Sequence, residues 1–229
     1  MEQNLRERVL QQVRAEIISG QSPPGTMYSV PSLSASLGVS TTPVREALLE
    51  LARIGLIEPV RNRGFKVVEP TLSELRDLFD MREVLELHAA RIVAQKPKKN
   101  LDGLYRLADE IARAVNEEDI RLYLEADRSY HRVLMEAAGN ALLTDTVLAL
   151  RDKMRLYGIK SRAGLDRQTQ SVSEHYAIVD LALKGDADGL ADLLKRHIRA
   201  WEPIFVDALT RTARETMREP LLASRRRVE

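Results

Sequence analysis

Leu, Val and Ile recur every three or four residues along most of the chain, a spacing that places their side chains on one face of a helix. In the first third this pattern predicts a helix over 5–19 and a short second helix that ends at Gly38. A third apolar stripe starts after Ser40 or Thr41, either of which can cap it, and stops at Gly55. Two helices therefore meet across a short polar turn.

The apolar period then changes to two. Segments 56–60 and 65–68 are joined by the residues RNRG and predict a hairpin, in which Gly64 can take the positive φ of a tight turn. Three helices and a hairpin with a basic tip predict a winged helix-turn-helix over residues 1–69. Residues 70–71 form the expected linker because proline interrupts both helices and strands.

The helical period resumes over residues 72–218 and predicts an all-α antiparallel six-helix bundle. The expected helices span residues 73–95, 101–116, 119–138, 141–163, 169–184 and 187–210, with one of the breaks at Gly164. The basic residues 219–229 form a tail that we expect to be disordered. The predicted fold class is mostly α, with a winged helix-turn-helix before the bundle.

The composition is that of a globular protein without membrane spans or disulfides. Of 229 residues, 44% are hydrophobic and 30% are charged, and no apolar run approaches the length of a membrane span. The N-terminus alternates charged and apolar residues and does not resemble a signal peptide. The absence of cysteine excludes disulfides and thiolate metal sites. We expect a cytoplasmic protein with no membrane association.

The net charge of +1 does not indicate a nucleic-acid binder, so the position of the charges must decide. Arg45 faces away from the apolar stripe of the third predicted helix and is available to DNA. Ser40, Thr41 and Thr42 offer hydroxyls and backbone N–H groups to phosphates at the start of that helix. Arg63 lies on the basic hairpin. The alternative for any one arginine is a solvated helix face.

The run from Pro24 to Val68, with its TPVREAL and RGF segments, resembles the winged-helix domain of the GntR family of bacterial transcription regulators. The helical remainder is similar to the FCD domain, the ligand-binding domain of the FadR-type branch. The resemblance implies DNA contacts by Thr42, Arg45, Gly64 and Arg63. Family members commonly place operator-contacting arginines where this chain has Thr41 and Pro31, which implies a different or weaker operator.

Asp127 and His131 lie four residues apart on one predicted helix, close enough to chelate one ion. His175 and His197 lie on later helices, and three bundle helices can direct such side chains to one interior point. The alternative is that each histidine is merely packed or exposed, which is the interpretation for His88. The resemblance implies that Asp127, His131, His175 and His197 are metal ligands. Three imidazoles and a carboxylate suit zinc, nickel or another first-row divalent ion, and we expect zinc.

In the family, such an ion lies beneath a pocket for a small organic acid. Arg82 matches a recurrent family arginine and can hold a carboxylate through two hydrogen bonds, so the resemblance implies effector binding. An ordinary salt bridge to Glu86, four residues away, is the alternative. Arg155 is a second effector-binding candidate that rests on helix phase alone.

The predicted function is a homodimeric transcription regulator, specifically a repressor, whose affinity for double-stranded operator DNA is controlled by a small carboxylate. Dimerisation follows because one short recognition helix covers few base pairs. One alternative is a regulator for which the metal ion itself is the signal. Another is a metallohydrolase, which is disfavoured because the chain has no H-E-x-x-H motif and Glu174 should point about 100° away from His175. No catalytic residue is expected.

Overall fold

The computed structural model describes residues 2–18, 20–68, 71–97, 101, 103–154 and 159–211. Its elements follow in the order α1 (Glu2–Ile18), β1 (Met27–Tyr28), α2 (Val30–Leu37), α3 (Thr41–Arg53), β2 (Ile57–Val60), β3 (Gly64–Val67), α4 (Leu72–Gln95), α5 (Leu104–Asn116), α6 (Ile120–Glu136), α7 (Ala141–Met154), α8 (Arg162–Lys184) and α9 (Ala187–Arg199). The predicted mostly α fold class is confirmed. None of the described helices is long and apolar enough to cross a membrane.

The first part of the chain is a winged helix-turn-helix. Helix α2 begins at the cap residue Ser29, whose side chain accepts a hydrogen bond from the Ser32 amide, and it ends at Gly38 in the left-handed conformation. Helix α3 follows directly and packs against α1. The apolar stripe predicted for α3 is buried and comprises Val44, Ala47, Leu48 and Leu51. The opposite face of α3 stays exposed to solvent.

The wing is a three-stranded antiparallel sheet with the strand order β1, β3, β2. The predicted hairpin pairs Ile57 with Val67 and Val60 with Gly64. Strand β1 is an addition that the sequence did not predict, because two residues are too short to give a period-two pattern. It pairs Tyr28 with Phe65 and so ties the segment before α2 to the wing.

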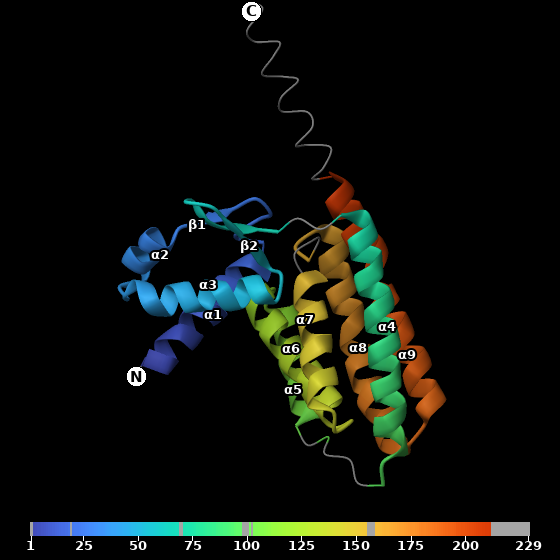
Figure 1. Cartoon of the computed structure of the whole chain (residues 1–229). Coiled ribbons are helices and arrows are strands. Elements are labelled where there is room, and N and C mark those ends of the chain that lie inside the picture. The colour runs from blue at the N-terminus through green and yellow to red at the C-terminus, as the bar shows by residue number, and fades with distance from the viewer. Residues whose placement is uncertain are drawn as a thin grey trace, which may run out of the picture.

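The remaining described helices form a bundle beside the winged helix-turn-helix (Figure 1). Helix α4 is capped by Thr71, which forms a capping box with Glu74, and it packs against α9 and α7. Helix α5 packs against α6 and α8. The bundle interior is mostly apolar, so the few charged groups that lie within it are conspicuous.

Several predicted boundaries in the bundle were wrong. Helix α8 starts at Arg162, because the hydroxyl of Ser161 caps it by accepting a hydrogen bond from the Gly164 amide at 3.0 Å. The predicted break at Gly164 therefore lies inside a helix, and the predicted helix over 141–163 was wrong at its end, where residues 159–160 form a turn. The predicted helix over 187–210 is interrupted by a turn at residues 200 and 201 and resumes at 202. Pro203 explains this, since proline cannot continue a helix but suits a first turn.

Candidate metal centre and nucleic-acid interface

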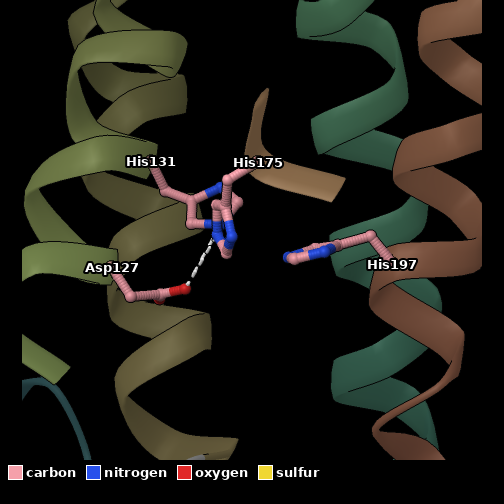
Figure 2. Close-up of side chains that lie close together, drawn as sticks. All are labelled: Asp127, His131, His175 and His197. Atoms are coloured by element: carbon pink, nitrogen blue, oxygen red, sulfur yellow. Dashed lines mark ion pairs between the residues drawn. The ribbon is translucent and has the colours of Figure 1, made fainter. Parts of the chain in front are cut away.

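The four predicted metal ligands converge inside the bundle. Asp127 and His131 lie one turn apart on α6, His175 comes from α8 and His197 from α9, and all four side chains point toward one another (Figure 2). One potential ligand atom from each lies within 4.8 Å of the others. All four residues are buried. This arrangement can surround a single ion.

Hydrogen bonds fix the orientation and the tautomer of two of the histidines. His175 Nδ1 lies 2.7 Å from the Ser171 carbonyl oxygen, and His197 Nδ1 lies 2.6 Å from Glu174 Oε2. Carbonyl and carboxylate oxygens only accept hydrogen bonds, so both Nδ1 atoms carry the hydrogen. The Nε2 atoms of these two rings are consequently left with a lone pair that can bind a metal ion.

Several polar atoms at the centre of this cluster are buried without a hydrogen-bond partner. They are both ring nitrogens of His131 and the Nε2 atom of His175. The separation from Asp127 Oδ1 is 3.3 Å for His175 Nε2 and 3.7 Å for His131 Nε2. Unpartnered buried polar atoms are costly, whereas a bound cation would use the lone pair of His175 Nε2 and that of the unprotonated ring nitrogen of His131. The residues therefore fit a divalent metal ion, and their nitrogen and oxygen donors suit zinc or nickel.

The protonation states favour metal binding as well. Burial lowers the pKa of His175 and of His197 to about 3, and it lowers the pKa of His131 well below the usual value. All three imidazoles are therefore neutral at pH 7, which is the form that binds metal. Partial burial alone would raise the pKa of Glu174, but hydrogen bonds from His197 and Arg167 lower it to about 2.

A second buried charge cluster adjoins the four ligands. Arg82 Nε donates to Glu86 Oε1 at 2.7 Å, which is the ion pair that the sequence offered as the alternative to effector binding. Arg151 of α7 donates to Glu86 Oε2 at 3.1 Å and to Asp127 Oδ2 at 3.0 Å. Burial alone would raise the pKa of Glu86, but the charges of Arg82 and Arg151 lower it. Arg155, the other candidate, lies outside the described residues.

The sequence prediction missed Arg151 and Arg167 at the candidate metal centre. It named Glu86 only as a salt-bridge partner of Arg82 and Glu174 only as a poorly placed general base, and gave neither a role at this centre. Glu86 could have been found, because it follows Arg82 on the buried stripe of α4, among alanines and larger apolar residues. Glu174 gave no such signal. Its carboxylate bonds with His197 on another helix, a contact that the sequence did not predict.

The predicted DNA-contacting residues lie on the exposed side of the winged helix-turn-helix. Ser40, Thr41, Thr42 and Arg45 are exposed at the start of α3. Arg63 is exposed in the turn between β2 and β3, whereas Gly64 is half-buried where β3 begins. These positions leave the N-terminal end of α3 and the wing free to meet a duplex.

Comparisons with known proteins cover both parts of the chain. Residues 5–67 match the family described as bacterial regulatory proteins, gntR family, and residues 77–200 match the FCD domain. A probable D-xylose utilization operon transcriptional repressor of Paenarthrobacter nicotinovorans is 30% identical over 203 residues, covering 86% of this chain and 89% of that protein. The HTH-type transcriptional repressor RspR of Escherichia coli (strain K12) is 24% identical over 200 residues, covering 86% and 87%.

A solved structure has a similar fold. The structure of E. coli McbR/YncC is 20% identical to this chain and superimposes with a TM-score of 0.78, covering 89% of this chain and 97% of that one. The matched families and relatives are transcription regulators and not enzymes, which removes the metallohydrolase alternative. The chain is a transcription regulator that belongs to the GntR family, with a DNA-binding winged helix-turn-helix followed by an FCD domain.

Proposed function

We propose that this protein is a homodimeric repressor whose operator affinity changes when a small organic acid binds over a divalent metal ion in the FCD domain. The proposal divides the chain into a DNA-binding domain over residues 1–69 and an effector domain over residues 72–218, joined by the linker 70–71. The single observation that carries the regulatory part is the convergence of Asp127, His131, His175 and His197 within 4.8 Å.

The DNA-binding role is supported by the surface of α3. Arg45 and the three hydroxyl residues before it are exposed together at the helix start, where backbone N–H groups and the helix dipole favour phosphates. A recognition helix enters the major groove with this end. Two copies related by a two-fold axis would read two half-sites, which is the reason for proposing a homodimer.

The metal role is supported by the chemistry of the donors. His131, His175 and His197 would hold the ion through imidazole nitrogens, and Asp127 would hold it through a carboxylate oxygen. The bound ion would supply a positive charge that attracts the carboxylate of an effector. Glu174 and the Ser171 carbonyl would keep His197 and His175 oriented toward the ion.

The acid-binding role of Arg82 is supported by its position beside the candidate metal centre. Its guanidinium, however, already forms an ion pair with Glu86. An effector carboxylate would therefore have to share Arg82 with Glu86 or replace it. Arg151, which is paired with the same glutamate, joins Arg82 in offering positive charge on this side of the candidate metal centre. A neutral metabolite would lack the charge attraction to these groups, and a cationic one would be repelled by them.

Thermal unfolding tests the metal and effector roles together. Zinc added to chelator-treated protein should raise Tm by about 5 to 10 °C at a hundredfold excess over Kd, since an ion that binds only the folded state stabilises it. His175→Asn should abolish this shift, whereas His88→Asn, at an exposed histidine, should retain it. Small carboxylates should then add a further shift only when zinc is present.

Several outcomes would count against the proposal. No shift of Tm with zinc or nickel would remove the metal role, and a zinc-independent carboxylate shift would separate the effector from the ion. If zinc alone changes DNA binding and no carboxylate adds to the effect, then the ion itself is the signal. That last outcome selects the metal-responsive alternative.

A further inference from the structure

An ion pair joins the winged helix-turn-helix to the bundle at Asp152, which follows Arg151, the partner of the candidate metal ligand Asp127. Arg14 of α1 donates to the Asp152 carboxylate of α7, and the two residues are 6% and 1% exposed. We infer that this contact transmits occupancy of the metal site to the orientation of the DNA-binding part. The inference rests on the proposed metal site and adds the route by which that site acts.

Asp152 is also held from within the bundle. Arg128 Nε of α6 lies 3.3 Å from Asp152 Oδ1. The carboxylate therefore receives one guanidinium from each of the two parts of the chain. Because it is almost completely buried, it depends on both partners to compensate its lost hydration.

The neighbours of these residues along the chain make the connection to the metal site. Asp127 and Arg128 are consecutive on α6, and Arg151 and Asp152 are consecutive on α7. Arg151 Nη2 donates to Asp127 Oδ2 at 3.0 Å inside the bundle, while Arg128 reaches Asp152 on the side that faces Arg14. Two ion pairs thus join the same turns of α6 and α7. In one, α6 supplies the carboxylate and α7 the guanidinium; in the other, the roles are reversed. One includes a candidate metal ligand, and the other holds the arginine of the winged helix-turn-helix.

A metal ion and Arg151 would both bind the Asp127 carboxylate. Cation binding at Asp127 weakens the attraction between Asp127 and Arg151, because the ion neutralises the charge that the guanidinium contacts. Any resulting shift of this turn of α7 carries Asp152 with it, since residues 151 and 152 are adjacent on a rigid helix. The shift therefore reaches Arg14.

The surroundings of Arg14 make this contact sensitive to small displacements. Its Nε atom is buried without a hydrogen-bond partner, so the buried charge of Arg14 relies on Asp152. An open cleft of about 1060 Å³ is lined by residues of α1 and of α6, which include Arg8, Arg121 and Glu125. Helix α1 is thus not closely packed on this side and has room to tilt.

The absence of cysteine allows the tilt to be measured by site-specific labelling. Spin labels at Ala35→Cys on α2 and Leu142→Cys on α7, both exposed positions, report the distance between the two parts by pulsed electron paramagnetic resonance. Labelled chains are diluted with unlabelled protein to suppress distances between subunits. Spectra are collected for the full chain with chelator and with saturating zinc, and zinc binding is measured separately by calorimetry.

We expect zinc to change the distance distribution of the parent protein. Arg14→Gln and Asp152→Asn should each abolish this change while zinc still binds, and the double variant should behave like either single variant because the two residues act through one contact. Arg121→Gln is the matched control. Arg121 lines the same cleft, but it forms its ion pair with Glu125 on its own helix, so the response should persist.

The outcomes separate this inference from the proposed function. Calorimetry without heat for zinc in the parent protein would mean that the metal site itself has failed. Zinc binding with no change of distance in the parent protein, or with the parent response retained in Arg14→Gln, would overturn the transmission role alone. Circular dichroism identifies a variant that does not fold, and the other single variant then decides the question. A role in stability alone would lower Tm but leave the zinc response intact.

Discussion

Glu174 is not one of the proposed metal ligands, but it contacts one of them. Its carboxylate accepts a hydrogen bond from His197 Nδ1 at 2.6 Å and another from Arg167 Nη2 at 2.5 Å. The first bond fixes the tautomer that presents Nε2 to the candidate metal centre, and the second holds the carboxylate in place. Loss of such a partner typically weakens metal binding by about 10-fold to 100-fold.

We therefore expect Glu174→Ala to raise the zinc Kd by about 10-fold to 100-fold, measured by competition with a chromophoric chelator. Asp166→Ala is the control, because Asp166 lies on the same helix and pairs only at the surface with Arg162, at 3.5 Å. Its effect should stay within about twofold. An unchanged Kd for Glu174→Ala would mean that His197 needs no partner or does not bind the ion.

At the scale of residues, the sequence could predict contacts between residues that lie close together on one helix. Asp127 and His131 are four apart on one helix, so their proximity follows from helix geometry alone. The pairing of Glu174 with His197, or of Arg151 with Asp127, depends on how three helices are packed, and no spacing in the sequence encodes it. Such outer partners become visible only when the fold is known.

At the scale of elements, Gly64 determines whether strand β1 can pair with β3 in the wing. Its φ is +116°, and a Cβ atom added there would lie 2.1 Å from the Tyr28 carbonyl oxygen of β1. Both the conformation and the close approach of the two strands therefore require glycine. The sequence predicted only the first reason, because β1 was not foreseen.

Gly64→Ala should lower the free energy of unfolding by at least about 2 kcal/mol in urea titrations, since backbone strain and a clash with a main-chain oxygen add together. Gly25→Ala separates the two effects. Gly25 has a φ of +85° and nothing within 4 Å of an added Cβ atom, so only the conformational cost of about 1 kcal/mol applies. Equal losses in both variants would indicate that β1 simply moves away from Gly64.

The element boundaries that were predicted wrongly have local physical causes. Glycine at position 164 suggests a break, but a helix interior tolerates glycine at a cost of about 1 kcal/mol, and the Ser161 cap outweighs it here. At the end of α9 the error was the reverse: a break occurs where the sequence predicted a continuous helix. Proline at 203 marks the restart of a helix that the apolar period suggested was continuous. The helical period thus predicted the helices well and their ends less well.

At the scale of the whole molecule, the charges that matter are few and local. The chain is nearly neutral overall, with 35 basic and 34 acidic residues, so long-range attraction cannot select DNA. We therefore expect the exposed start of α3 to supply much of the affinity for DNA through short-range contacts. Thr41 and Pro31, in place of the arginines typical of the family, remove two cations from this surface. We therefore expect Arg45 to carry a larger share of DNA binding than it would among more basic neighbours.

Arg45→Ala should therefore lower affinity by at least about tenfold for a duplex that the parent protein selects from a random pool, measured by gel shift at moderate salt. If Arg45 contacts a phosphate, the slope of log affinity against log salt should also fall by about one. Arg53→Ala is the control, since Arg53 is exposed at the far end of α3 and pairs with Glu50 at 2.5 Å. Equal affinity in the parent protein and Arg45→Ala would mean that α3 does not enter the groove by its N-terminal end.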